Sequence, residues 1–168
     1  IWSNPWFPEW IQWPQIWILP GPATWALALT LDLQIQRERN STWALPSDPM
    51  AYPRTGLDQS TWSTVLKPIS FTDAMASGVL WAIVISRFKN FHDVAKTIME
   101  DAELTCVIRP YLDGDDEPWT GANLRHGTRV VSFEDRSGSF TGTSHGGTIW
   151  DGLNRTVMNF FSDFETEE

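Results

Sequence analysis

Residues 25–37 read WALALTLDLQIQR, and this stretch decides the fold that the sequence predicts. Its leucines and one isoleucine alternate with small or polar residues, which is the period-2 pattern of a half-buried antiparallel strand. The pattern predicts that the leucine side packs against a helix at 73–88, with Asp32 on the opposite side. Because a long apolar edge invites aggregation, we expect this strand to pair with the main sheet, or across a dimer with a second copy.

Two helices are predicted further along the chain. Ser70 or Thr72 can cap the first helix, at 73–88, where apolar residues recur at steps of three and four. The second helix covers roughly 92–101 and has apolar residues on one side.

The second half of the chain is predicted to form mainly strands. Residues 103–112 are typical of a strand, and Pro110 indicates an edge or a bend there. The apolar residues of 130–133 fit a short helix or a strand, whereas 137–150 and 155–164 are predicted as strands. Helices followed by strands in one compact chain indicate the α+β class.

Composition and charge limit the possible functions. A chain of 168 residues is of single-domain size, and its net charge of −9 argues against binding to a nucleic-acid backbone. The single Cys106 excludes an internal disulfide framework and a cysteine-based zinc site, and weakly favours a reducing, cytoplasmic setting. Glycosylation-type triplets at Asn40 and Asn154 favour the opposite, so localisation stays open. The opening residues do not have the pattern of a signal peptide.

Tryptophan is unusually abundant, with 11 in the chain. Residues 1–24 combine tryptophans at intervals of three and four with prolines that interrupt a helix or a transmembrane span. We interpret 1–24 as an arm that lays its indoles on an apolar surface, and 25–168 as a single α+β domain. The apolar surface can be the protein's own core, a partner subunit or a membrane interface.

Three segments carry a family resemblance. Residues 69–107, ISFTDAMASGVLWAIVISRFKNFHDVAKTIMEDAELTCV, resemble the opening of the SnoaL-like and scytalone-dehydratase-like proteins, including the acidic step DAEL at 101–104. Residues 127–133, GTRVVSF, are similar to the signature around the third helix, and 144–150, SHGGTIW, to the strand that brings a histidine into the pocket. The resemblance implies a nuclear transport factor 2-like cone fold, in which a curved antiparallel sheet wraps on helices.

The same resemblance implies a small-molecule pocket. His145 would act as acid or base near neutral pH, although a strand histidine bonded to a backbone carbonyl is an equally simple interpretation. The family pairs its histidine with an acid in the first helix and with a second histidine, and this chain has neither at the matching positions. A proton relay would need Asp73, Asp101 or Glu103 instead, and of these we assign Asp101. The residues expected to line the pocket are Trp119, Tyr111, Phe133 and Trp150. The sequence thus predicts a lyase or isomerase without cofactor or metal, acting on a hydrophobic ligand related to polyketides or terpenoids.

Two alternatives come from other functional classes. Residues around Trp62 and Trp119 are similar to the mRNA cap-binding translation initiation factors, in which two such rings stack on a methylated guanine. However, Thr120 stands where that family needs an acid to bond the guanine edge. The other alternative is a non-enzymatic assembly subunit that docks through its tryptophan-rich arm, either on a protein partner or in a homodimer.

Overall fold

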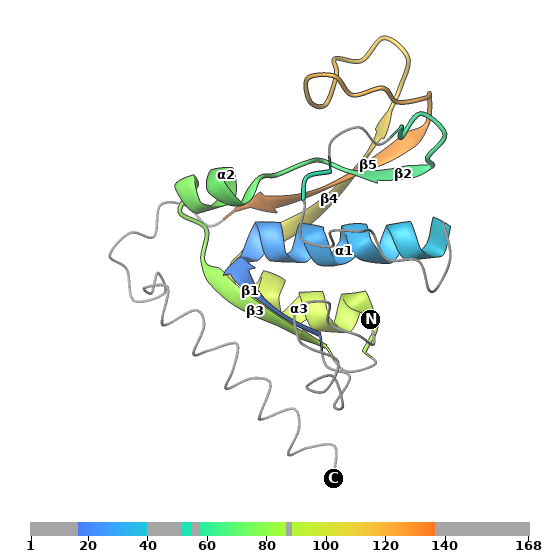
Figure 1. Ribbon diagram of the computed structural model, residues 1–168. Coiled ribbons are helices and arrows are strands. Elements are labelled where there is room, and N and C mark those ends of the chain that lie inside the picture. The colour runs from blue at the N-terminus through green and yellow to red at the C-terminus, as the bar shows by residue number, and fades with distance from the viewer. Residues whose placement is uncertain (1–16, 40–51, 55–57, 87–88, 137–168) are drawn as a thin grey trace.

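The computed structural model describes residues 17–39, 52–54, 58–86 and 89–136 of the 168-residue chain. Three helices and five strands are arranged around one central helix (Figure 1). In chain order the elements are β1 (Trp17–Pro22), α1 (Ala23–Arg39), β2 (Thr64–Leu66), α2 (Phe71–Ala76), β3 (Trp81–Ser86), α3 (Phe91–Asp101), β4 (Leu104–Tyr111) and β5 (Thr128–Asp135).

Helix α1 is the centre of the structure. Figure 1 shows it between the sheet that contains β5 and the layer formed by β1, β3 and α3, and it contacts elements on both sides. Its buried residues lie all around the helix and include Ala28 and Asp32 as well as the leucines. In the described ranges, no helix has both the length and the apolar character needed to cross a membrane.

The prediction of a strand at 25–37 is wrong, because these residues belong to α1. Leucine, alanine, glutamine and arginine dominate the segment, and all four are strong helix formers. The first half of α1, residues 23–30, is buried on every side and needs no polar face, so its sequence loses the 3.6-residue period that identifies a surface helix. The alternation of leucines was therefore not evidence for a strand. Neither pairing with the main sheet nor pairing across a dimer applies to a helix.

The strands form two open sheets. Strands β1 and β3 pair antiparallel, with Trp17 opposite Ser86. The second sheet has the order β2-β5-β4, in which β4 and β5 are antiparallel and β2 and β5 are parallel. The predicted α+β class is thus confirmed as a mixed structure of helices and open sheets. The cone-type wrapping stays a prediction.

The predicted helix at 73–88 is only partly correct. Its cap is confirmed, since the Ser70 side chain accepts a hydrogen bond from the Asp73 backbone N–H, but α2 ends at Ala76. Gly78 adopts φ +74°, a left-handed conformation that ends a helix and suits glycine. The β-branched residues that follow form β3, because such side chains fit a pleated surface better than a helix.

The remaining described elements agree with the sequence. The second predicted helix is α3, which Asn90 caps by accepting a hydrogen bond from the Asp93 N–H. The predicted strand at 103–112 is β4, and Pro110 lies on an edge strand as expected. Residues 130–133, which fitted either a helix or a strand, belong to β5.

The end of the proposed arm is part of the folded core. Trp17 is 1% exposed, and its indole N–H donates a 3.3 Å hydrogen bond to Thr30 Oγ1 on α1. Thr30 in turn donates to the Ala26 carbonyl within the helix. The other four tryptophans of the arm lie outside the described residues, so the surface that they contact stays a prediction. The boundary between arm and domain stays a prediction.

Candidate functional site

An aromatic cluster lies at one end of the β2-β5-β4 sheet. It combines three buried residues, Trp62, Val65 and Val130, with the partly buried Ile35, Tyr111, Trp119 and Leu124. The segment before β2 is fixed to β5, since Thr128 Oγ1 donates to the Trp62 carbonyl at 3.0 Å and Arg129 N–H donates to Ser63. These two bonds hold the Trp62 ring over the sheet.

The Trp62 ring is buried and already contacts a cation of the same chain. Its exposed fraction is 8%, and the Arg39 guanidinium lies 4.6 Å from the ring centroid in a cation–π contact. A ring that stacks on a methylated guanine needs an open face, and Arg39 occupies the place that such a cation would take. The cluster therefore joins the C-terminal end of α1 to the sheet.

Polar side chains in the loop between β4 and β5 form hydrogen bonds with backbone groups of the same loop. Asp115 accepts a hydrogen bond from the Leu112 N–H at 2.9 Å, and Glu117 accepts one from the Gly121 N–H at 3.0 Å. His126 Nδ1 lies 3.1 Å from the Asp113 backbone nitrogen and 3.5 Å from the Asp113 carboxylate. These side chains serve the turn itself, so the acidic loop gives no sign of a catalytic arrangement.

The structure places the predicted site residues in different surroundings. Tyr111 and Trp119 share the aromatic cluster, whereas Phe133 packs on the main core, with its ring centroid 6.3 Å from that of Phe91. Asp101 is the half-buried last residue of α3. The remaining two, His145 and Trp150, lie outside the described residues. The structure brings Tyr111 and Trp119 together, and a site formed by the whole set stays a prediction.

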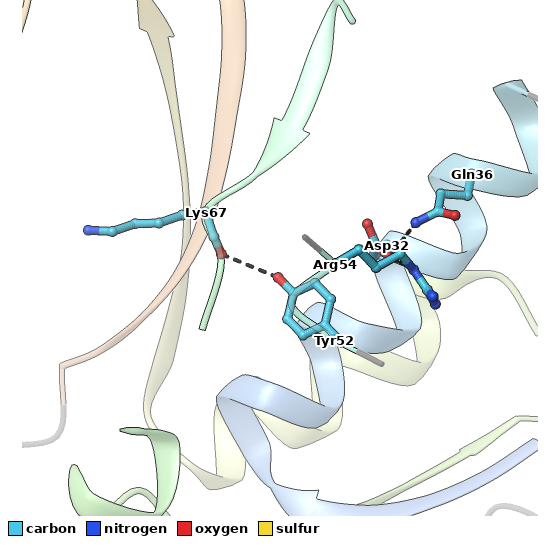
Figure 2. Close-up of polar contacts among 5 residues, drawn as sticks. All are labelled: Asp32, Gln36, Tyr52, Arg54 and Lys67. Atoms are coloured by element: carbon cyan, nitrogen blue, oxygen red, sulfur yellow. Dashed lines mark hydrogen bonds and ion pairs between the residues drawn. The ribbon is translucent and has the colours of Figure 1, made fainter. Parts of the chain in front are cut away.

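A buried polar network was missed by the sequence reasoning (Figure 2). Asp32 accepts hydrogen bonds from Arg54 Nε at 3.1 Å and from Gln36 Nε2 at 2.7 Å. Beside this pair, the Tyr52 hydroxyl donates to the Lys67 carbonyl at 3.3 Å. The short segment 52–54 is thereby tied to α1 through Arg54 and to the end of β2 through Tyr52.

Burial sets the electrostatics of this network. Desolvation raises the pKa of Asp32, and the neighbouring Arg54 opposes that rise by favouring the charged carboxylate. The pKa of Tyr52 is raised well above its ordinary value, first by burial and then by the negative charge of Asp32. Both hydrogen bonds of the Asp32 carboxylate link it to other residues of the chain, one in α1 and one in the 52–54 segment. We therefore regard the network as structural, a clamp between α1 and the 52–54 segment.

One signal in the sequence could have revealed the clamp. Asp32 stands alone between leucines in an otherwise apolar stretch, and a buried acid needs a charged partner. The partner could not be named, because Arg54 lies in a region rich in proline with no regular pattern. Among the residues that the structure describes, no three histidine, cysteine or acidic side chains are grouped as metal ligands would be.

Comparison with known proteins gives a consistent result. The model of the family described as "Siphovirus ReqiPepy6 Gp37-like protein" matches residues 1–164. The chain is 33% identical to minor tail protein Gp28 of Mycobacterium phage D29, over 187 aligned residues that include 99% of this chain. It is 32% identical to minor tail protein Gp28 of Mycobacterium phage L5 over the same share of the chain. In both cases the chain spans 31% of the relative's length.

These matches correct the predicted family and function. The resemblance to SnoaL-like and scytalone-dehydratase-like proteins is wrong, because a different family accounts for almost the whole chain. The short motifs that carried the resemblance included 69–107, and part of that segment forms β3 where a long helix was expected. The prediction of a lyase or isomerase with a small hydrophobic ligand is also wrong, since the relatives are named minor tail proteins. The chain belongs to the siphovirus ReqiPepy6 Gp37-like protein family.

Proposed function

We propose that this chain is a structural part of a siphovirus tail and acts through contacts with neighbouring tail proteins. The observation that carries the proposal is the family match over residues 1–164, together with two relatives that are named minor tail proteins. The chain spans 31% of those relatives, so the proposal covers only the part of a tail protein's role that the matching portion can carry. This is the assembly alternative that the sequence left open.

Strand β4 is the described surface that best suits such a contact. Among the described strands it lies at the edge of its sheet, and the exposed fraction is 59% for Ile108 and 44% for Leu112, just beyond the strand. Cys106 is exposed on the same side of β4 as Ile108. An edge that presents apolar side chains and unpaired backbone groups readily binds another chain. We expect a neighbouring tail protein to cover it.

The tryptophan-rich arm is a second proposed contact. Trp17 is buried in the protein's own core, so it has no indole surface to offer to a partner. Any docking by the arm must therefore use the tryptophans before Trp17, which lie outside the described residues. Removing the arm before Trp17 should weaken attachment to the tail without unfolding α1.

Electron microscopy with a gold-labelled antibody tests the proposal. An antibody raised against the purified chain should label the tails of phage particles made from the genome that encodes it. Particles from a genome with a stop codon in this gene provide the control for antibody specificity. Label that is absent from tails, with the chain present only in the surrounding lysate, would refute a structural role in the tail.

A further inference from the structure

Arg37 is a buried cation without a counter-charge in the described part of the chain. It lies in the last turn of α1, is 7% exposed, and its Nε atom has no hydrogen-bond partner. Arg54 provides the contrast, because its side chain is 10% exposed and its Nε lies 3.1 Å from the Asp32 carboxylate. The two arginines differ in pairing far more than in burial.

An unpaired arginine in this position is unfavourable for the isolated chain. Burial lowers the pKa of Arg37, which reflects the loss of water around its charge. The C-terminal end of a helix favours a cation, yet it supplies only a partial charge. The sequence holds 21 acidic residues, and within the described ranges none of them forms an ion pair with Arg37. Buried charges are normally paired, so this exception calls for an explanation outside the described fold.

The position of Arg37 on α1 fits a contact with another protein. Arg37 follows Leu33 by four residues and Thr30 by seven, so the three lie on one side of the helix. That side receives the indole of Trp17, the first residue of β1, through the hydrogen bond to Thr30. Arg37 therefore extends along α1 two turns beyond the Trp17 contact, toward the end of the helix that points away from the start of β3 (Figure 1).

We propose that Arg37 binds an acidic side chain of a neighbouring tail protein. A guanidinium presents paired N–H donors in a fixed plane, which match the two oxygens of a carboxylate. The contact would supply the missing counter-charge, so the cost of burying Arg37 is offset on assembly. This inference rests on the proposed function in a phage tail. A carboxylate supplied by the chain itself is the competing explanation, and the first experiment distinguishes the two.

The first experiment compares Arg37→Met with Arg54→Met in the purified chain. Methionine keeps much of the side-chain length and removes the charge. If Arg37 lacks a counter-charge in the free protein, Arg37→Met leaves the midpoint of urea unfolding unchanged or raises it, whereas Arg54→Met lowers it. A midpoint that falls as far for Arg37→Met as for Arg54→Met would overturn the proposal, because Arg37 would then be paired within its own chain.

The second experiment measures entry into the tail. The complete tail polypeptide, either wild type or carrying Arg37→Met, is supplied to a phage with a stop codon in this gene, and its amount in purified tails is determined. We expect Arg37→Met to lower the amount about tenfold, as the loss of one partner of a buried charge pair does at other interfaces. The matched control is Arg39→Met: Arg39 is exposed in the same turn and its guanidinium already stacks on Trp62 within the chain, so its loss should lower the amount in tails far less than the loss of Arg37.

The outcomes separate this inference from the proposed function. Wild-type polypeptide that fails to enter tails would refute the structural role itself. Wild type and Arg37→Met that enter equally would leave the structural role standing and refute only the part assigned to Arg37.

Discussion

Arg54 Nε lies 3.1 Å from Asp32 Oδ2, and this ion pair joins a proline-containing segment to the central helix. Both side chains are almost fully buried, so neither charge has water to replace its partner. Removing one member should therefore cost far more than removing both. We expect Arg54→Met to lower the free energy of unfolding by about 3 kcal/mol. Urea unfolding should show that the double variant Asp32→Asn/Arg54→Met is more stable than Arg54→Met alone, and a less stable double variant would contradict the pairing.

Because the pKa of Asp32 is raised, the stability lost in the Arg54→Met variant should depend on pH. Burial favours the protonated carboxyl, so the folded state holds a proton at pH values where the unfolded chain, with a pKa of 3.8, has lost it. Stability that involves Asp32 is thus lost as pH rises from 3.8 through the folded pKa. Without Arg54 to favour the carboxylate, the variant should lose more stability, relative to wild type, at about pH 7 than at about pH 5. Equal losses at both values would contradict this assignment.

Tyr52 should ionise only well above the ordinary tyrosine pKa of 10.0. The chain has two tyrosines, so Tyr111→Phe leaves Tyr52 as the only one, and its tyrosinate absorbance can be followed directly. Because the unfolded chain ionises first, stability should fall as pH rises above about 10, and a Tyr52→Phe variant should lose this part of the alkaline dependence. Tyrosinate absorbance that appears near its ordinary pKa while the Tyr111→Phe variant remains folded would rule out the buried position of Tyr52.

Ala28 distinguishes the helix from the predicted strand. In α1 it is 2% exposed, whereas alternation would place it on the polar side of a strand. Ala28→Arg should therefore prevent folding, because a large charged group has no room in a packed core. Gln34→Arg is the matched control, since Gln34 is only half-buried and lies one turn from Glu38, to which it donates a hydrogen bond. Circular dichroism should show lost helicity for the first variant only, and normal folding of Ala28→Arg would contradict the structure.

Ile108 and Val131 lie opposite each other in the β4–β5 register, so their side chains project from the same face of the sheet, Ile108 on the outer strand and Val131 on the middle strand. Ile108 is 59% exposed and Val131 is 5% exposed. We expect Ile108→Thr to change the free energy of unfolding by less than about 0.5 kcal/mol, as at most surface positions. Val131→Thr places a hydroxyl in the core and should cost about 1–3 kcal/mol. Thermal or urea unfolding that shows equal losses would mean that Ile108 is covered within the chain.

Local signals in the sequence predicted the elements at the surface of the fold. The cap at Ser70, the helix at 92–101 and the edge strand with Pro110 all depend on hydrogen bonds or periodicity within a few residues. The buried elements were predicted wrongly for physical reasons. The first half of α1 has no polar face to reveal its period, and the positive φ of Gly78 ends α2 inside the segment 73–88, which was predicted as one helix.

The functional residues were harder to predict because they depend on distant parts of the chain or on other proteins. The partner of Asp32 is Arg54, and 22 residues separate them in a region without a regular pattern. Arg37 could not be identified as unpaired until its neighbours were known. The proposed structural role also requires no catalytic motif. The sequence therefore held no stronger signal that could outweigh the weak resemblance to enzyme motifs around His145.

The most direct test of the structural role is quantitative mass spectrometry of tails separated from heads. Peptides from this chain should appear in the tail fraction in a constant ratio to other tail proteins, across preparations and after washing with concentrated salt. A constant ratio after washing indicates specific assembly through an extended interface, because weak surface charge contacts are screened by salt. Peptides that are absent from washed tails, while the chain remains abundant in the infected lysate, would contradict the account.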